Sequence, residues 1–423
     1  MIRLCSVEKN VVTIELSVEL SGSMLESEER ILCAVNEAGV MLSGESLKRF
    51  DTDGSPIMTG SVKWTSKGRV DKVYQTPYGE TRVGRHVYQN SAGGRTHCPL
   101  DVDARIVASS TPRFAKMISH KEADSATTVV QRDLAENHGR KVSRDFVHQT
   151  AEAVGAIAQL KEESWRYETP KLARPVASVA VGIDGTCMFI AKDGWREAMS
   201  GTLSLYAEDG ERLHTVYVGG APEYGKDAFL KRMTREIDHV AALYPSATRV
   251  GLADGAKCNW AFLAEHTQFQ ILDFWHVAAY LDTFAKAAYP ADEAAHRTWL
   301  DENCHDLKNN SDAARRILAR MEEYAAGDIS AAAKEQIGAV LTYFRNNWPR
   351  MNYAYYLCKG LPIGSGVTEA ACKTLVKHRL CASGMRWKEH GAGIVLSLRA
   401  LVLTPDRWNQ FWDKVNRFGF SFA

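Results

Sequence analysis

The sequence predicts a multidomain protein of mixed α and β structure. Its 423 residues exceed what one ordinary hydrophobic core encloses, so we expect two or three domains. Short alternating strand signals give way to a helical period near residue 111, and strand signals return near residue 177. From residue 290 the chain becomes rich in Ala, Glu and Arg, with helical signals only. The expected class is therefore α+β / α/β.

The composition argues against a membrane protein and a disulfide scaffold. No apolar stretch approaches the ~20 residues that cross a bilayer, and the N-terminus alternates polar and apolar residues, unlike a signal peptide. The nine cysteines form no CxxC pair, so we expect reduced thiols, mostly buried. These features predict a cytoplasmic protein with no membrane partner. The net charge of +1 decides nothing about nucleic acid, because a basic face can hide in a balanced total.

Residues 1–110 are predicted to form a β-rich module. We expect a strand from Val11 to Leu20, a helix from Ser27 to Ala38, and then short hairpins. Basic and aromatic side chains are mixed through the hairpins, which suits a nucleic-acid surface. An ordinary solvated β-module explains the same mixture equally well.

Residues 111–160 show a helix-turn-helix pattern. Two helical stripes flank a turn containing Gly139, and Ser143 is suited to cap the second helix. That helix would present Arg144, His148 and Gln149 outward, near the end of a recognition helix that reaches base edges. A structural hairpin that braces the next domain is the alternative. Residues 161–175, charged and containing two prolines, are interpreted as a linker.

The order of elements in residues 176–289 is strand, strand, strand, helix, strand, helix, strand. This succession is typical of a catalytic core of the ribonuclease H type, in which an antiparallel trio is extended by parallel strands. Residues 290–350 are predicted to be an all-helical insertion. Residues 351–423 would complete the core, with a Gly-rich loop, a helix carrying Glu369, and C-terminal helices.

Three acids stand where apolar runs give way to Gly-rich turns or to a helix. Asp184 follows VAVGI, Asp254 follows VGLA, and we expect both at strand ends. Two divalent ions held by carboxylates can activate the attacking oxygen and stabilise the leaving oxygen in phosphoryl displacement. Magnesium prefers such hard oxygen ligands. Taken singly, each aspartate could be a turn residue, and Glu369 a first-turn acid favoured by the helix dipole.

From Ala177 to its end the chain resembles a DDE transposase, and the run GLPIGSGVTEAACKTLVKHRLCASGMRWKEHGA resembles the ISKra group of bacterial insertion-sequence transposases. The resemblance implies Asp184, Asp254 and Glu369 as the catalytic, metal-binding triad. It implies two ions of Mg²⁺ (or Mn²⁺) as cofactors. It also implies a helical insertion between the second and third acids.

Two further motifs agree with this resemblance. The run Asp273-Phe274-Trp275-His276 is similar to a D-x-x-H signature whose Asp and His form a structural pair near the site. From the residues alone, Asp273 could orient the imidazole of His276 or could simply cap a helix. Beyond Glu369, basic residues would supply phosphate contacts: Lys373, Lys377, Arg379, Arg386 and Lys388. Trp387 among them is interpreted as a core residue in preference to a base-stacking one.

The functional hypothesis is a DNA transposase of the bacterial cytoplasm and nucleoid. Water would cleave a strand at the element's end, and the released 3′ hydroxyl would attack target DNA. The expected partners are DNA, as terminal inverted repeats and target, and a second copy of the chain or more on that DNA. A ribonuclease H-like nuclease without joining activity and a domesticated, non-catalytic DNA-binding protein are the alternatives.

Overall fold

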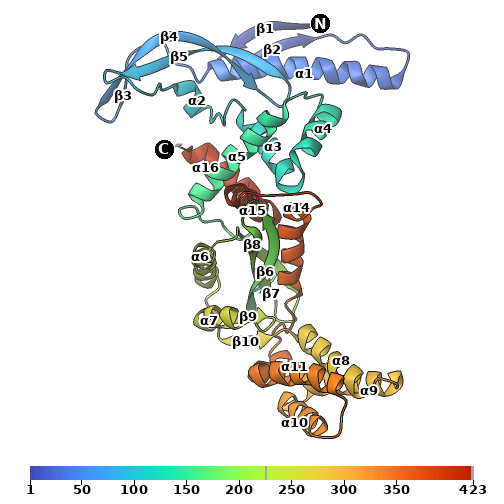
Figure 1. The fold of residues 1–423 in the computed structure, drawn as a ribbon. Coiled ribbons are helices and arrows are strands. Elements are labelled where there is room, and N and C mark those ends of the chain that lie inside the picture. Colours follow the sequence, from blue (N-terminus) through green and yellow to red (C-terminus); the bar gives the residue numbers. More distant parts are fainter. Residues whose placement is uncertain (224–225, 421–423) are drawn as a thin grey trace. The chain divides into compact units, whose positions relative to one another are not determined.

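The computed structural model describes residues 1–223 and 226–420. It is a mixed α+β protein, about half helical, with a five-stranded mixed sheet and small antiparallel sheets (Figure 1). The chain divides into two compact units, residues 1–167 with 397–402 and 407–423, and residues 168–396 with 403–406. No helix in the described residues is both long and apolar enough to cross a membrane.

The first unit begins with two antiparallel sheets and one long helix. Strands β1 (Ile2–Glu8) and β2 (Val11–Leu16) pair with each other, and helix α1 spans Met24–Lys48. The second sheet has the order β3-β4-β5, formed by Ile57–Thr59, Val62–Gln75 and Glu80–Asn90. Strand β2 begins at the predicted residue, Val11, but ends at Leu16, four residues before the predicted end at Leu20. Strand β1 was not predicted.

Helix α1 continues ten residues beyond the predicted end at Ala38. Glycine has a low helix propensity, so local propensity alone would end the helix near Gly39 and Gly44. In the fold both glycines are buried, and a Cβ atom on either would collide with the side chain of Tyr78 or Thr81. Close packing against the hairpin thus explains the glycines, and this contact cannot be deduced from the local sequence.

A small helical cluster follows in the same unit. Helices α2 (Pro99–Asp103) and α3 (Pro112–Asp124) precede α4 (Thr127–His138) and α5 (Arg144–Lys161). The prediction that Ser143 caps α5 is confirmed, because its side chain accepts a hydrogen bond from the backbone N–H of Phe146. Gly139 takes the left-handed conformation after α4. Helix α3 shares one core with the two predicted helices, made of Phe114, Ile118, Val130, Leu134, Val147 and Ala151.

The sheet of the second unit has the order β10-β9-β6-β7-β8. Strands β6 (Ser178–Ile190), β7 (Gly194–Tyr206) and β8 (Arg212–Gly220) are antiparallel. Strands β9 (Thr248–Ala253) and β10 (Phe269–Leu272) run parallel to β6. Helix α6 (Asp227–Leu243) lies between β8 and β9 in sequence, and α7 (Lys257–His266) between β9 and β10. The predicted succession of elements is confirmed.

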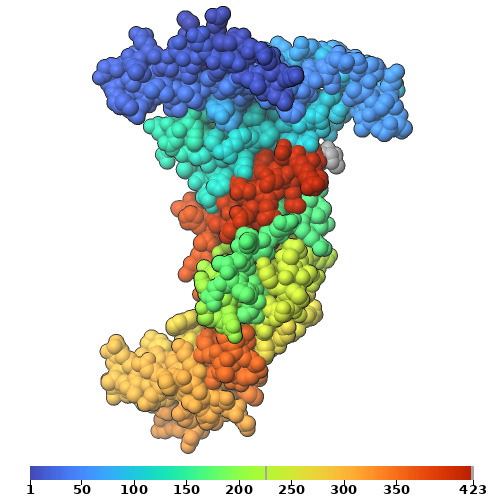
Figure 2. Space-filling view, turned by 180° about the vertical axis from the view of Figure 1, so that it is seen from behind, coloured from blue at the N-terminus to red at the C-terminus, as the bar shows by residue number. Residues whose placement is uncertain are grey.

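The helices after β10 gather into a lobe of this unit (Figure 2). They are α8 (Phe274–Ala288), α9 (Glu293–Asn309), α10 (Ala313–Ala325) and α11 (Ala331–Asn347). Every residue from 290 to 350 is described, and none is in a strand, as the sequence predicts. A short 3₁₀ turn, Trp348–Arg350, and α12 (Tyr353–Cys358) return the chain to the sheet.

The last helical stretch carries Glu369. Helix α13 (Gly366–Ala371) continues into a π-helical turn (Cys372–Lys377) and α14 (His378–Leu380). Helix α15 (Glu389–Leu403), whose residues are divided between the units, and α16 (Arg407–Phe418) complete the fold. The nine cysteines are all free thiols, but only Cys372 is buried, so the prediction that most are buried is wrong. Most lie on the outer faces of their elements, which composition does not reveal.

Gly182 allows α13 to approach β6. A Cβ atom at this position would collide with Oγ1 of Thr368 on α13, and would lie 3.0 Å from Oγ1 of Thr202 on β7. Gly182→Ala is therefore expected to destabilise the protein by about 1–3 kcal/mol, the usual cost of overpacking a buried contact. Urea denaturation measures the change. Gly391→Ala is the control, since the nearest atom there is 3.9 Å away, and an equal loss in both variants would contradict the explanation.

Candidate metal centre

The structure brings the three predicted acids to one pocket. The parallel pairing of β6 with β9 ends at Gly182 and Leu252, and Asp184 and Asp254 each lie two residues beyond that pair. Glu369 comes from α13, and all three side chains line a cavity of about 210 Å³. Carboxylates 70 and 115 residues apart in sequence thus share one site.

Asp184 lies within β6, so the expectation that it ends a strand is wrong. It pairs with Ser200, and the β6–β7 ladder continues to Ile190. Only the parallel half of the sheet stops here, because β9 ends at Ala253, and this exposes one side of β6. One carboxylate oxygen accepts the N–H of Gly185 at 2.7 Å, and the other accepts the thiol of Cys372 at 3.2 Å. Burial raises the pKa of Cys372 to about 11, so the thiol remains a hydrogen-bond donor.

Asp254 is exposed at the end of β9, on a tightly fixed backbone. Gly255 has φ +118°, a conformation that favours glycine, and the N–H of Ala256 donates to Oδ1 of Asp254 at 3.2 Å. The hydroxyl of Tyr343 on α11 donates to the backbone carbonyl of Asp254 at 2.9 Å. The helical lobe therefore helps to hold this turn.

Glu369 is held from two sides. Its Oε1 lies 3.0 Å from the hydroxyl of Ser365, which shares its one proton between this carboxylate and that of Asp273, and Nδ1 of His276 lies 3.7 Å from the same oxygen. A hydrogen bond of 2.8 Å between the hydroxyls of Thr202 and Thr368 ties α13 to β7. The π-helical turn begins at Cys372, immediately after this helix, and such turns occur frequently at functional sites.

Asp273 and His276 satisfy both interpretations made from sequence. Asp273 is fully buried and caps α8 by accepting the N–H of His276 at 2.8 Å, and its Oδ1 also lies 3.1 Å from Nδ1 of the imidazole. Its Oδ2 accepts the backbone N–H and the hydroxyl of Ser365. Burial alone would raise the pKa of Asp273, but bonds from His276 and Ser365 lower it to about 2. Bonding to Asp273 raises the pKa of His276.

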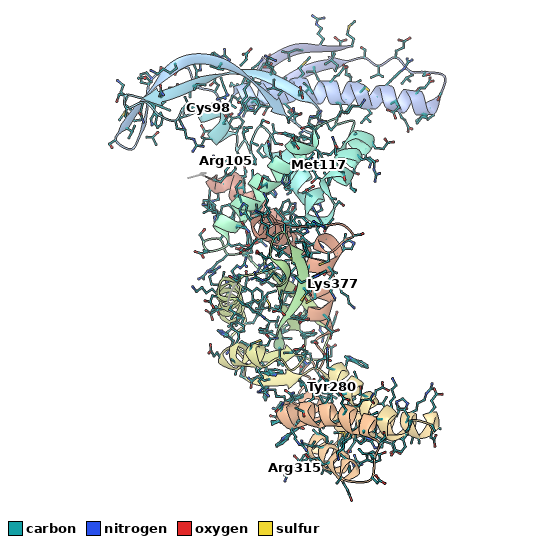
Figure 3. All side chains as sticks on the ribbon, in the orientation of Figure 1. Cys98, Arg105, Met117, Tyr280, Arg315 and Lys377 are labelled. Atoms are coloured by element: carbon teal, nitrogen blue, oxygen red, sulfur yellow. The ribbon has the colours of Figure 1, made fainter. Side chains whose placement is uncertain are left out.

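The predicted basic residues separate into three groups. Lys373 and Lys377 are exposed and line the acidic pocket, and Lys377 extends from its helix in Figure 3. Arg386 and Lys388 are exposed outside the pocket. Arg379 was expected to present its charge to solvent, and this prediction is wrong. The residue is 4% exposed, and its guanidinium lies 5.1 Å from the ring centre of Trp387. Trp387 is half-buried and donates to the carbonyl of Leu380 at 2.9 Å, in keeping with a structural role.

In the first unit, the predicted DNA-contacting residues Arg144, His148 and Gln149 are all exposed on α5. They face solvent on the first two turns of that helix. His148 lies 4.0 Å from the carboxylate of Glu152, one turn further along. This exposure leaves the three side chains accessible to a ligand of any kind.

The donor set suits a hard divalent cation. Carboxylates of Asp184, Asp254 and Glu369 offer oxygen atoms, which Mg²⁺ and Mn²⁺ prefer. Ligand atoms of Asp273, His276 and Glu369 also lie within 4.8 Å of one another. Asp273 is fully buried and already accepts bonds on both oxygens, so it fits a positioning role better than a ligand role.

Three residues that shape the site were not predicted from the sequence. Ser365 bridges Asp273 and Glu369, and its spacing of four residues before Glu369 was the available signal. Cys372 follows Glu369 by three residues, which places both on one helix face. Tyr343 supports Asp254 from 89 residues away, and no local pattern indicates it.

A comparison with models of known protein families gives no match, and a comparison with curated proteins gives none.

Proposed function

We propose that the protein is a DNA transposase of the DDE type with a ribonuclease H-like core, cutting strands at element ends and joining them to target DNA. The convergence of Asp184, Asp254 and Glu369 on one cavity carries the proposal. The strand order, an antiparallel trio extended by two parallel strands, supports the same core. The all-helical segment between the second and third acids is a further point of agreement.

Each side chain of the site has a defined part in this chemistry. Asp184, Asp254 and Glu369 would hold two Mg²⁺ or Mn²⁺ ions, which supply activation of the attacking oxygen and charge stabilisation on the leaving oxygen. Lys373 and Lys377 contact the phosphates of the strand beside them. Ser365 and His276 fix the carboxylate of Glu369, so the ligand set is oriented before DNA arrives.

The DNA-binding surfaces are proposed from exposure and charge. Arg144, His148 and Gln149 on α5 would read base edges at the terminal repeats. Exposed Arg386 and Lys388 would add phosphate contacts. Because joining two element ends needs two sites, the active species would contain at least two copies of the chain on DNA.

Strand transfer tests the proposal. The protein is incubated with Mg²⁺ or Mn²⁺ and DNA carrying the ends of the element that encodes it, both intact and pre-cut, plus a target plasmid. We expect cleaved ends and sequenced junctions with the target, and neither product in the presence of EDTA. Cleavage without joining would identify the nuclease alternative, and DNA binding with no metal-dependent nicking would identify a non-catalytic DNA-binding protein.

A further inference from the structure

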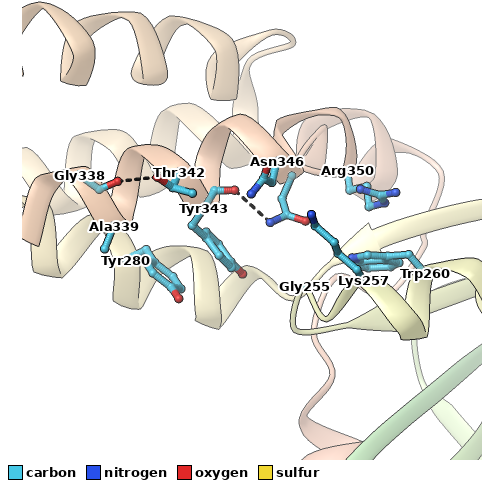
Figure 4. Close-up of a pocket in the computed structure, with 11 residues that line it drawn as sticks. Gly255, Lys257, Trp260, Tyr280, Gly338, Ala339, Thr342, Tyr343, Asn346 and Arg350 are labelled. Atoms are coloured by element: carbon cyan, nitrogen blue, oxygen red, sulfur yellow. Dashed lines mark hydrogen bonds between the residues drawn. The ribbon is translucent and has the colours of Figure 1, made fainter. Parts of the chain in front are cut away.

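A second, larger cavity lies beside the metal centre in the same unit. It has a volume of about 680 Å³ and is bounded by the turn after β9, helix α7, and helices α8 and α11 of the helical lobe (Figure 4). Its size is within the range of pockets that hold one small ligand. We call it the lobe groove.

The lobe groove offers two aromatic surfaces. Tyr280 of α8 and Tyr343 of α11 stack face to face, with ring centres 3.8 Å apart and planes inclined by 13° (Figure 4). Trp260 of α7 lies under the guanidinium of Arg350, 4.6 Å from the ring centre. Such flat faces provide stacking positions for a planar ring.

The charge of the lobe groove is one-sided. Lys257 and Arg350 line it, no acid does, and neither cation forms an ion pair within residues 1–223 and 226–420. Trp260 is buried, with 6% of its surface exposed. Its indole N–H has no hydrogen-bond partner in the described part of the chain.

The lobe groove and the pocket of the three acids are lined by two consecutive residues of the chain. Asp254 lines the metal pocket, and the next residue, Gly255, lines the lobe groove. Tyr343 contributes its ring to the groove and its hydroxyl to the carbonyl of Asp254. A strand whose phosphate lies among the three acids can therefore place a neighbouring nucleotide in the groove.

We infer that the lobe groove binds one unpaired nucleotide of the DNA strand that passes through the metal centre. Stacking faces select a planar base, two unpaired cations select its phosphate, and the absence of acids removes repulsion. The amide of Asn346, which is exposed, offers hydrogen bonds to a base edge. The inference rests on the proposed function for the identity of the strand, but nucleotide binding itself does not require catalysis.

Photocrosslinking of the full chain in EDTA tests the inference without cleavage. DNA duplexes carry one unpaired 5-iodo-2′-deoxyuridine at successive positions, and crosslinked peptides are identified by mass spectrometry. We expect crosslinks at Trp260, Tyr280 or Tyr343. Fluorescence anisotropy then compares duplexes with and without the unpaired base.

Arg350→Gln and Lys257→Gln are each expected to weaken binding of the duplex with the unpaired base by about tenfold, and of the paired duplex much less. Arg345→Gln is the matched control on α11, since Arg345 is exposed, pairs with Glu322 at 2.8 Å and lies outside the groove. Lys257 is exposed, so its variant remains informative if Arg350→Gln fails to fold.

Equal losses in all three variants, or crosslinks only outside the groove, would overturn the inference. A parallel titration with free dAMP separates the two sources of a nucleotide. Binding of dAMP that depends on Arg350, with DNA affinity unchanged in Arg350→Gln, would show a free nucleotide as the occupant and also overturn it. Because no arm depends on cleavage, an absence of strand transfer leaves these outcomes distinct.

Discussion

Asp184→Asn, Asp254→Asn and Glu369→Gln are each expected to lower the rate of metal-dependent strand cleavage by about a thousandfold or more. Each change removes one carboxylate from the shared cavity, where in the proposed function the acids are the hard ligands for a divalent cation. A metal ion contributes several kcal/mol of transition-state stabilisation, and about 1.4 kcal/mol corresponds to a factor of ten in rate. Single-turnover cleavage of end-containing DNA measures the loss.

Asp193→Asn is the matched control for these variants. Asp193 is exposed at the turn between β6 and β7, where it lies 3.9 Å from Arg196, far along the strand from the cavity. Its substitution removes the same charge and is expected to leave cleavage unchanged. Gel-shift titration should show that all four variants still bind the terminal repeats. If any of the three cavity variants cleaved at the normal rate, the assignment of the metal centre would fail.

The second large effect is expected at Asp273, on stability first and on activity as a consequence. Asp273→Ala removes a fully buried carboxylate that accepts bonds from His276 and Ser365. These donors are left without their acceptor, which costs about 3 kcal/mol or more when the lost partner was charged and buried. Urea denaturation of the full chain measures the change.

The lowered pKa of Asp273, about 2, fixes the pH range of this contribution. A carboxyl that ionises more easily in the folded state stabilises the fold fully above its unfolded pKa, near 3.8, and loses that contribution as the pH falls through about 2. Because the bond to Asp273 also raises the pKa of His276 above its ordinary 6.5, the stability difference between Asp273→Ala and the unaltered protein should be greatest between about pH 4 and 6.5, and should diminish as the pH rises through that raised pKa. It should shrink in strong acid.

Asp292→Ala separates the capping role of Asp273 from its bridging role. Asp292 also caps a helix, α9, by accepting the N–H of Ala295 at 2.9 Å, but it is exposed. Loss of such a cap costs about 1 kcal/mol. Metal affinity, measured by Mn²⁺ titration calorimetry, should fall in Asp273→Ala because Ser365 and His276 no longer fix Glu369, and should be unchanged in Asp292→Ala. Equal effects in both variants would show that Asp273 acts only as a helix cap and does not orient Glu369.

Elements with strong local signals were predicted well. Helix α6 begins and ends at the predicted residues, Asp227 and Leu243, because its apolar stripe and flanking turns are local features. Ser143 caps α5 for the same reason. The helical segment from 290 to 350 also follows from composition and period.

Predictions failed where a partner distant in sequence decides the outcome. The end of α1 depends on packing of Gly39 against Tyr78, and the position of Asp184 within a strand depends on the long β6–β7 ladder. Arg379 is buried because Trp387 covers it, so a basic residue in a basic run was no guide to a solvent-facing charge. Local periodicity contains no information on such contacts.

The sequence by itself determined the order of strands and helices in residues 176–289, the helical nature of the segment before Glu369, and three acids at positions suited to metal ligation. Only the tertiary structure decided that these acids share one cavity, that Ser365 and Cys372 hold two of them, and that Tyr343 links Asp254 to the lobe groove. The physical reason is that periodicity and capping act within a few residues, whereas a site forms from strand register and close packing between residues many positions apart.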